Sequence, residues 1–162
     1  MKDALTGDEL IDPETKRPIA TPENLEAAAE QIRARLATRP VAGQVKTPDS
    51  IIEDLEWAKY GASQLPAILR DADRAVRVLQ RRYSAAFVKA VRQSDARSAD
   101  ERRLEAEQAL APLLAQLDAA EVAYEYAKRV AKSVEAAQSN VQSQAAMVRV
   151  TYDLAGSGRG RG

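Results

Sequence analysis

A row of arginines is the feature of this sequence whose residue type and spacing best fit a binding function. Residues 67–93 carry seven basic and two acidic side chains, a local net charge of 7 − 2 = +5. At about 100° per residue along a helix, five of these arginines share one face, opposite the predicted apolar seam: Arg70, Arg74, Arg77, Arg81 and Arg92. Such a row could contact the phosphates of a nucleic acid. The alternative is an ordinary solvated face, or pairing with acids of residues 94–162 or of another subunit.

The sequence contains no group of residues suited to catalysis. It has no His and no Cys, which excludes histidine- and cysteine-based catalysis, Cys/His zinc sites and disulfides. Pairs of carboxylates occur on predicted helices, and we interpret them as solvated faces: Asp71/Asp73, Glu105/Glu107 and Glu121/Glu125. No Gly-rich phosphate-binding loop follows a strand. We therefore expect no catalytic residue, no cofactor, no metal and no small-molecule substrate, and hence no enzymatic activity.

The composition is typical of a protein made of long helices. The 162 residues carry 24 basic and 24 acidic side chains, giving a net charge of zero, and 4% of them are aromatic. The zero net charge and the scarcity of aromatic residues count against strong nucleic-acid binding. Since no apolar stretch is long enough to cross a membrane and the first nine residues do not resemble a signal peptide, we expect a cytoplasmic protein with no membrane partner.

Two long runs of small and apolar residues, spaced alternately by three and four, predict the fold. One runs from Ile51 to Ala90 and the other from Leu113 to Tyr152. Heptad spacing of this length indicates a coiled-coil-like pair of helices. We expect an all-α fold, a long antiparallel helical hairpin with Ala90 near Leu113 at its tip and Ile51 near Tyr152 at its base.

The segments outside the two runs complete the predicted organisation. The capping box Ser98-Ala-Asp-Glu101 predicts a separate short helix at the tip, ending near Leu110 because Pro112 disfavours helix at the preceding residue. Thr21-Pro22-Glu23 predicts a helix over about 22–37, after an extended arm with turns at its prolines. The predicted parts are the arm, short helix and linker (1–46), the hairpin (47–155) and a flexible Gly/Arg tail (156–162). Arg159 and Arg161 of this tail could add a weak nonspecific contact to nucleic acid.

Two polar or helix-breaking residues in the predicted seam suggest how its register is fixed. Pro66 lies inside the first long helix, so the carbonyl of Ala62 loses its partner and a kink is expected. The predicted register places Gln138 opposite Leu65 and Pro66. We hypothesise that the Gln138 amide donates to this carbonyl region; the alternative is a hydrated kink with Gln138 turned aside. The apolar surface is wider than the seam needs, which favours a homo-oligomer.

Residues 55–154 resemble a loose family of small helical proteins encoded by tailed bacteriophages and prophages near DNA recombination genes. The resemblance lies in a long helix with an Arg/Lys row (Ala72-Asp-Arg74 to Tyr83-Ser-Ala-Ala-Phe87), a short charged helix (Ser98 to Ala106), and a long last helix after Ala111-Pro112. It covers about 100 residues. The family has no established activity that transfers residue by residue, so the resemblance implies only a phage accessory protein in DNA metabolism.

These observations lead to one functional hypothesis and two alternatives. We expect a non-enzymatic helical interaction protein, a phage accessory factor in DNA recombination or replication. It would act in the host cytoplasm through an unidentified protein partner and could contact nucleic acid along the arginine row. The first alternative is a structural head or tail accessory protein of the virion, assembling as a homo-oligomer in which residues 1–20 connect neighbours. The second is an inhibitor of a host defence nuclease.

Overall fold

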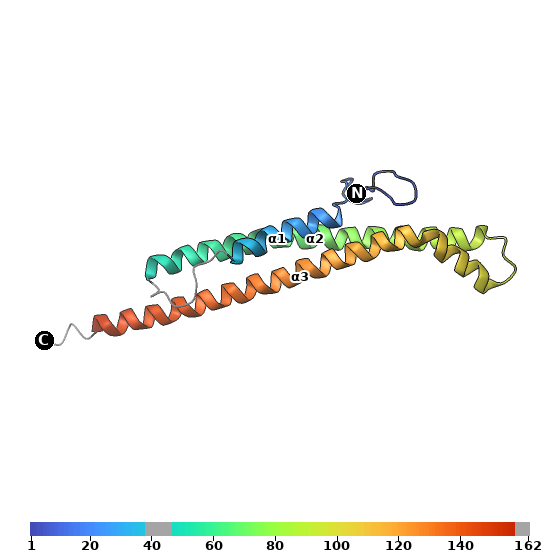
Figure 1. Ribbon diagram of the computed structural model, residues 1–162. Helices are drawn as coiled ribbons and strands as arrows, with labels where there is room; N and C mark the ends of the chain where they lie inside the picture. The colour runs from blue at the N-terminus through green and yellow to red at the C-terminus, as the bar shows by residue number, and fades with distance from the viewer. Residues whose placement is uncertain (38–46, 158–162) are drawn as a thin grey trace. The chain divides into compact units, whose positions relative to one another are not determined.

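The computed structural model describes residues 1–37 and 47–157 and shows an all-α protein. The order of elements is α1 (Pro22–Ala37), α2 (Pro48–Gln93) and α3 (Ala99–Ser157) (Figure 1). The linker predicted after α1 and the tail arginines Arg159 and Arg161 lie outside the described residues. The chain divides into two compact units. The first comprises Met1–Ala28 and Ala67–Ala127, and the second comprises Ala29–Pro66 and the residues from Lys128 onward.

Each helix begins directly after a Ser or Thr residue, and at Thr21 and Ser98 the sequence predicts this start. In all three cases the side-chain hydroxyl accepts a hydrogen bond from the backbone N–H three residues later, which satisfies a donor left free at the helix end. The pairs are Asn24 to Thr21 at 3.2 Å, Ser50 to Thr47 at 3.2 Å and Glu101 to Ser98 at 3.1 Å. A carboxylate oxygen of Glu101 in turn accepts from the N–H of Ser98 at 3.2 Å, so the predicted capping box is formed.

The prediction of a separate tip helix ending before Pro112 is wrong, because α3 continues through this proline. Pro112 is exposed, so its ring does not have to be packed in the core. The residues on either side of it, Leu110 and Leu113, are 5% and 0% exposed and belong to one continuous buried face with Leu117. Burial of this face outweighs the hydrogen bond that proline removes, and the helix is not interrupted.

The core of the first unit combines large aliphatic side chains with alanines. Ala72, Ala75 and Leu79 of α2 share a buried cluster with Ile19, Leu25 and four residues of α3: Leu113, Leu117, Ala120 and Ala123. Four of these nine residues are alanines, which bury little area but let helices approach closely. Residues 1–20 contribute Ile19 to the cluster, and Met1 and Leu10 pack against it. The N-terminal residues therefore belong to the core of this unit.

In the second unit, α1, α2 and α3 meet at Gly61. A β-carbon at Gly61 would lie 3.5 Å from the Val134 side chain and 3.7 Å from that of Ile32, so a small residue brings the three helices together. The other buried apolar residues of this unit lie on the same three helices: Ala29, Ile51, Ala58, Leu65, Val130 and Val141. The guanidinium of Arg35 also lies 4.0 Å from the ring centroid of Tyr60, a cation–π contact between α1 and α2.

The contact at Gly61 corrects the predicted register. Aligning Leu65 with Gln138 would place Gly61 opposite Gln142, but Gly61 lies against Val134, about two helical turns earlier on α3. The error in the predicted register arises from the length of the segment between α2 and α3. Because α3 begins at Ala99, the segment between the helices is only residues 94–98 instead of the expected twenty or so. Within the described residues the Gln138 side chain makes no hydrogen bond, so the expected donation to the carbonyl of Ala62 is not formed. Pro66 does lie inside α2.

The burial pattern follows the two apolar runs closely, although the predicted register between α2 and α3 was wrong. Every residue of both runs is buried or partly buried except Tyr152, which is 59% exposed. The helical spacing therefore identified the buried faces of α2 and α3 correctly, although it aligned them wrongly.

Candidate interaction surface

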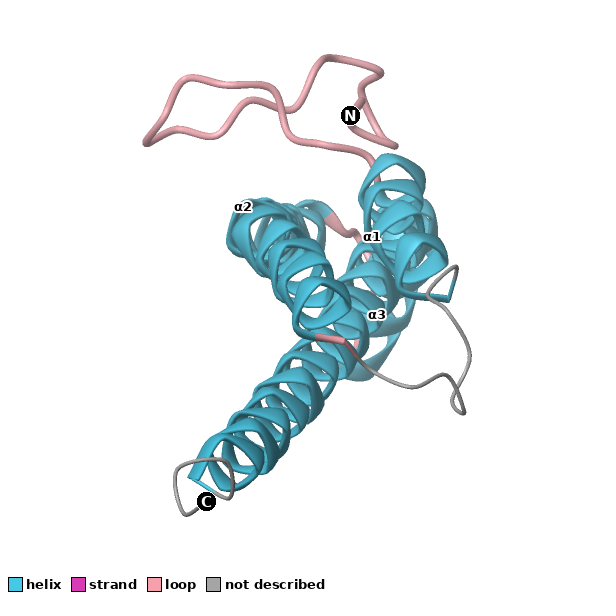
Figure 2. Cartoon of the chain, turned by 90° about the vertical axis from the view of Figure 1, so that its left-hand side faces the viewer, coloured by secondary structure: helices cyan, strands magenta, loops and turns pink. Residues whose placement is uncertain are grey.

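The N-terminal arm, residues 1–20, consists of two loops with the same backbone hydrogen bonds instead of an extended segment (Figure 2). In the first loop, Asp3 N–H donates to the carbonyl of Asp8 at 2.8 Å, and Gly7 N–H donates to the carbonyl of Asp3 at 2.9 Å. The second loop repeats both bonds nine residues later: Asp12 to Arg17 at 2.9 Å and Lys16 to Asp12 at 2.9 Å. Both turns follow an aspartate; the second contains Pro13, as predicted from the proline, whereas the first contains no proline.

The seventh residue of each loop has a left-handed backbone conformation. Gly7 has a φ of 76° and Lys16, nine residues later, a φ of 57°. Glycine adopts this conformation without a steric penalty, whereas a lysine is strained by about 1 kcal/mol or somewhat more. A strained residue that reproduces the geometry of the first loop shows that the second loop is held in shape by its other contacts.

Each loop also begins with an aliphatic residue that faces the core. Leu10 N–H donates to the carbonyl of Met1 at 2.8 Å, and Ile19 N–H donates to the carbonyl of Leu10 at 2.9 Å. These bonds connect successive loops and bring Met1, Leu10 and Ile19 to the same side of the arm, against the buried cluster of the first unit. The aliphatic residues recur every nine positions because the loops have nine residues each.

The carboxylate of the aspartate in each loop accepts hydrogen bonds from its own turn. Asp3 Oδ1 accepts from the N–H groups of Leu5 at 2.8 Å and Thr6 at 3.3 Å. Asp12 Oδ1 accepts from the N–H of Glu14 at 3.0 Å, and its Oδ2 accepts from the Thr15 hydroxyl at 2.6 Å. These bonds hold both carboxylates in a fixed orientation.

The aspartates pair with arginines of α2. Asp3 Oδ2 lies 2.6 Å from Arg82 Nε, and Asp12 Oδ2 lies 2.8 Å from Arg74 Nε. Both aspartates are buried, at 4% and 3% exposed. A buried carboxylate needs such a partner because removal of water from a charge is unfavourable. The exposed pair Arg81–Glu14, at 3.5 Å, adds a weaker contact.

The first loop is also bound to α3. The side-chain amide of Gln116 accepts from the N–H of Ala4 at 3.2 Å and donates to the carbonyl of Lys2 at 2.5 Å. These two bonds satisfy a backbone N–H and a backbone carbonyl of the first loop. The first loop therefore contacts both α2 and α3 through polar side chains.

The environment of both aspartates lowers their pKa. For Asp3, burial by itself raises the pKa, but the hydrogen bonds from Leu5, Arg82 and Thr6 together outweigh it and the net shift is downward. For Asp12, the hydrogen bond from Thr15 is the largest cause of the lowered pKa, followed by the N–H of Glu14 and with a smaller contribution from the charge of Arg74. Both side chains are therefore carboxylates at neutral pH, as pairing with arginine requires.

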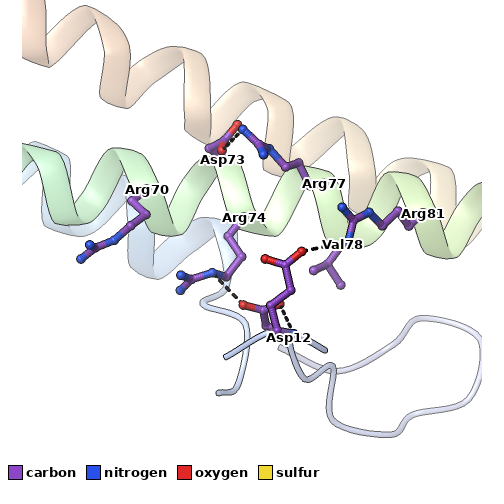
Figure 3. Close-up of a pocket in the computed structure, with 8 residues that line it drawn as sticks. Asp12, Arg70, Asp73, Arg74, Arg77, Val78 and Arg81 are labelled. Carbon is purple, nitrogen blue, oxygen red and sulfur yellow. Dashed lines mark hydrogen bonds and ion pairs between the residues drawn. The ribbon is translucent and has the colours of Figure 1, made fainter. Parts of the chain in front are cut away.

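A hollow of about 170 Å³ lies where the second loop meets α2 (Figure 3). Four arginines and three carboxylates line it, together with Val78: Arg70, Arg74, Arg77, Arg81, Asp12, Glu14 and Asp73. The formal charge is 4 − 3 = +1. Arg77 pairs with Asp73 at 2.7 Å, while Arg74 also reaches Asp71 at 3.2 Å. The side chains of Arg77 and Arg81 are 67% and 64% exposed, so their pairs are screened by water.

The structure brings together four of the seven arginines proposed from sequence. Arg70, Arg74, Arg77 and Arg81 line the hollow, whereas Arg92 lies in the last turn of α2 and is not part of it. Sequence reasoning missed Arg82, and it looked for acidic partners after residue 94 instead of in the arm. The repeat itself was visible in the sequence: Asp3 and Asp12, then Thr6 and Thr15, recur with a period of nine.

Two kinds of site or segment are absent from the described residues, 1–37 and 47–157. These residues contain no group of three or more His, Cys, Asp or Glu side chains placed to hold a metal ion. They also contain no helix that is both long and apolar enough to cross a membrane.

Comparison of the chain with protein-family models, with curated proteins and with solved structures finds no match.

Proposed function

We propose that this chain is a non-enzymatic helical interaction protein that binds an acidic segment of a partner protein at the arginine face of α2, by which we mean Arg70, Arg74, Arg77, Arg81 and Arg82. The observation that carries the proposal is that this face already holds acidic loops of the chain itself. Three carboxylates of the arm contact three arginines of α2, and the two shortest pairs involve buried aspartates. A surface that binds carboxylates in this way has the chemistry to bind those of another protein.

The charge of the surface favours a protein partner over a nucleic acid. Binding to a duplex gains most of its affinity from many arginine or lysine contacts to phosphates. Here the carboxylates of Asp12, Glu14 and Asp73 offset most of the positive charge in the hollow. Nucleic-acid contact along Arg70, Arg74, Arg77, Arg81 and Arg92 remains the second candidate, favoured by the exposure of Arg77 and Arg81.

The finer architecture forms part of the same proposal. We propose that α2 and α3 pair as an antiparallel hairpin with a coiled-coil-like seam, supported by the residues they share in the core of the first unit and by the contact of Gly61 with Val134 in the second. Apolar side chains exposed on α2 and α3 supply surface that self-association would bury: Val88, Leu104, Val122, Met147, Val150 and Tyr152. Light scattering over a range of protein concentrations tests this, and a constant monomer mass would contradict it.

The role of a phage accessory factor in DNA recombination or replication completes the proposal, on the basis of the sequence resemblance. The virion alternative requires residues 1–20 to connect neighbouring subunits. In the structure these residues make their contacts within the first unit of their own chain, which supports the interaction protein in preference to a connecting arm.

A binding assay with charge-matched variants tests the proposed function. The probes are a fluorescent 20-residue peptide of alternating Glu and Ala and a fluorescent single-stranded oligonucleotide of 20 nucleotides, each titrated at low and moderate salt. We expect the peptide to bind the full chain and to lose affinity in R70Q/R77Q/R81Q. The control K89Q/R97Q/R103Q removes the same charge from exposed residues outside the hollow. Equal loss in both variants, or binding of the oligonucleotide alone, would contradict the proposal.

A further inference from the structure

The two loops of the arm show what the arginine face recognises. They share an aliphatic first residue, an aspartate at the third position, a threonine at the sixth and a left-handed backbone at the seventh. The remaining positions differ in size and charge: Lys2 and Ile11, Ala4 and Pro13, Leu5 and Glu14, Asp8 and Arg17, Glu9 and Pro18. Two different sequences therefore adopt one geometry and pair with α2 in the same way. The contacts that both loops make outside the arm come from two of the shared positions: the aspartate pairs with an arginine of α2, and the aliphatic residue packs on the apolar cluster.

The paired contacts divide the recognition into two parts. The aspartate uses Oδ1 to accept from the backbone of its own turn and Oδ2 to contact an arginine Nε, at 2.6 Å in the first loop and 2.8 Å in the second, where Oδ2 also accepts from the Thr15 hydroxyl. The aliphatic residue packs on the apolar cluster of the same unit. A loop that fixes its carboxylate before binding loses little conformational freedom on contact, so the motif is a better ligand than an unstructured acidic segment.

We propose that the arginine face of α2 is a recognition surface for this nine-residue loop, and that its partner is a protein segment carrying copies of the same motif. This inference rests on the proposed function and names the partner's chemistry. The motif is aliphatic-x-Asp-x-x-Thr, followed by a residue that adopts a left-handed backbone. The arm of this chain is then an intramolecular ligand, which the partner segment displaces from Arg74 and Arg82.

The test uses the full chain as receptor and a fluorescent peptide with the sequence of residues 1–20 as probe. In the receptor D3N/D12N the arm keeps its turns, but the two side chains that contact Arg82 and Arg74 are neutral. We expect this receptor to bind the peptide about tenfold or more tightly than the wild-type chain does, because its own arm competes less. A second receptor, D3K/D12K, has an arm that the arginines repel, and we expect it to bind at least as tightly.

Three controls separate recognition of the motif from attraction of charge. Adding R74Q/R82Q to either receptor, or placing D3N/D12N in the peptide, should each weaken binding by about tenfold or more, since each removes two charged hydrogen bonds. A peptide of shuffled sequence has the same composition and charge, and we expect it to bind as weakly. Circular dichroism and a urea titration of each receptor confirm that its helices are intact.

Each contrary outcome has a distinct meaning. If the shuffled peptide binds as tightly as the native one, recognition of the motif is refuted while the proposed binding of acidic segments stands. If neither peptide binds D3N/D12N or D3K/D12K and the acidic Glu/Ala peptide does not bind the wild-type chain, both are refuted. If only a single-stranded oligonucleotide binds these receptors, the face recognises phosphates and the motif inference is wrong.

Discussion

Asp3 makes the contact of the arm whose removal has the clearest expected effect. The substitution Asp3→Asn retains an oxygen that can accept from Leu5 and Thr6, but it places an amide donor or a neutral oxygen against Arg82 Nε. It therefore removes the ion pair and leaves the turn. A hydrogen bond to a charged group contributes roughly 1.5–3 kcal/mol. Because the Arg82 side chain is 40% exposed, solvent screens part of this, and we expect a loss of about 1–2 kcal/mol.

The assay is urea unfolding monitored by circular dichroism, applied to a double-mutant cycle. Asp3→Asn and Arg82→Gln are measured singly and together, and we expect a coupling free energy of about 1 kcal/mol. Asp3→Ala also removes the acceptor of the turn and should cost about 1 kcal/mol more than Asp3→Asn. The matched control is Asp73→Asn, which breaks the exposed pair with Arg77 on the same helix and should cost less than about 0.5 kcal/mol.

The result that would refute this reasoning is specific. If Asp3→Asn destabilises the chain no more than Asp73→Asn does, and the coupling with Arg82→Gln is zero within error, the buried pair does not hold the arm. A large effect of Asp3→Ala in the presence of a null effect of Asp3→Asn would show that only the turn matters.

Three further predictions concern the arm and α3. The pKa values of Asp3 and Asp12 are lowered from 3.8, so the folded state favours their charged forms; the contribution is complete above about pH 5 and is lost as the pH falls below 3.8. The difference in urea midpoint between wild type and D3N/D12N should therefore shrink from pH 6 to pH 3, and a constant difference would contradict the assignment. Lys16→Gly should stabilise the chain by about 0.5–1 kcal/mol in urea unfolding because Lys16 has a φ of 57°, and Lys2→Gly, at an exposed residue of the other loop, is the control; equal effects of the two substitutions would refute the strain. Pro112→Ala should stabilise α3 by about 1–3 kcal/mol without changing its helical content by circular dichroism, since Pro112 is exposed and the helix already continues through it; a gain in helical signal would show that the helix is broken at that residue.

Local sequence signals were sufficient for the starts of the helices. Thr21, Thr47 and Ser98 each satisfy a donor within three residues of themselves, so the starts of α1, α2 and α3 could be predicted without knowledge of the rest of the chain. The spacing of apolar residues likewise identified which faces of α2 and α3 are buried, because helical periodicity is a local property. It also placed Arg70, Arg74, Arg77 and Arg81 on one face.

Other features depend on contacts that local signals do not encode. Whether Pro112 ends a helix is decided by the burial of Leu110 and Leu113, and the position of that boundary shifted the whole register. The repeat in residues 1–20 could have been found by comparing the chain with itself at a spacing of nine. The pairing of its aspartates with arginines of α2 could not have been found in this way, because the repeat does not indicate which residues the aspartates contact.

The sequence alone determined that the chain is all-α, which faces of its helices are buried, and that arginines cluster on one side of α2. Each of these features depends on residues within a few helical turns of one another. Only the tertiary structure decided what the arginines contact. Asp3 and Arg82 are 79 residues apart, and their pairing requires that the arm fold into loops, that Met1, Leu10 and Ile19 pack on the core, and that α2 present Arg82 at that place. An ion pair between distant residues forms because packing brings the two charges together, and no local pattern records that packing.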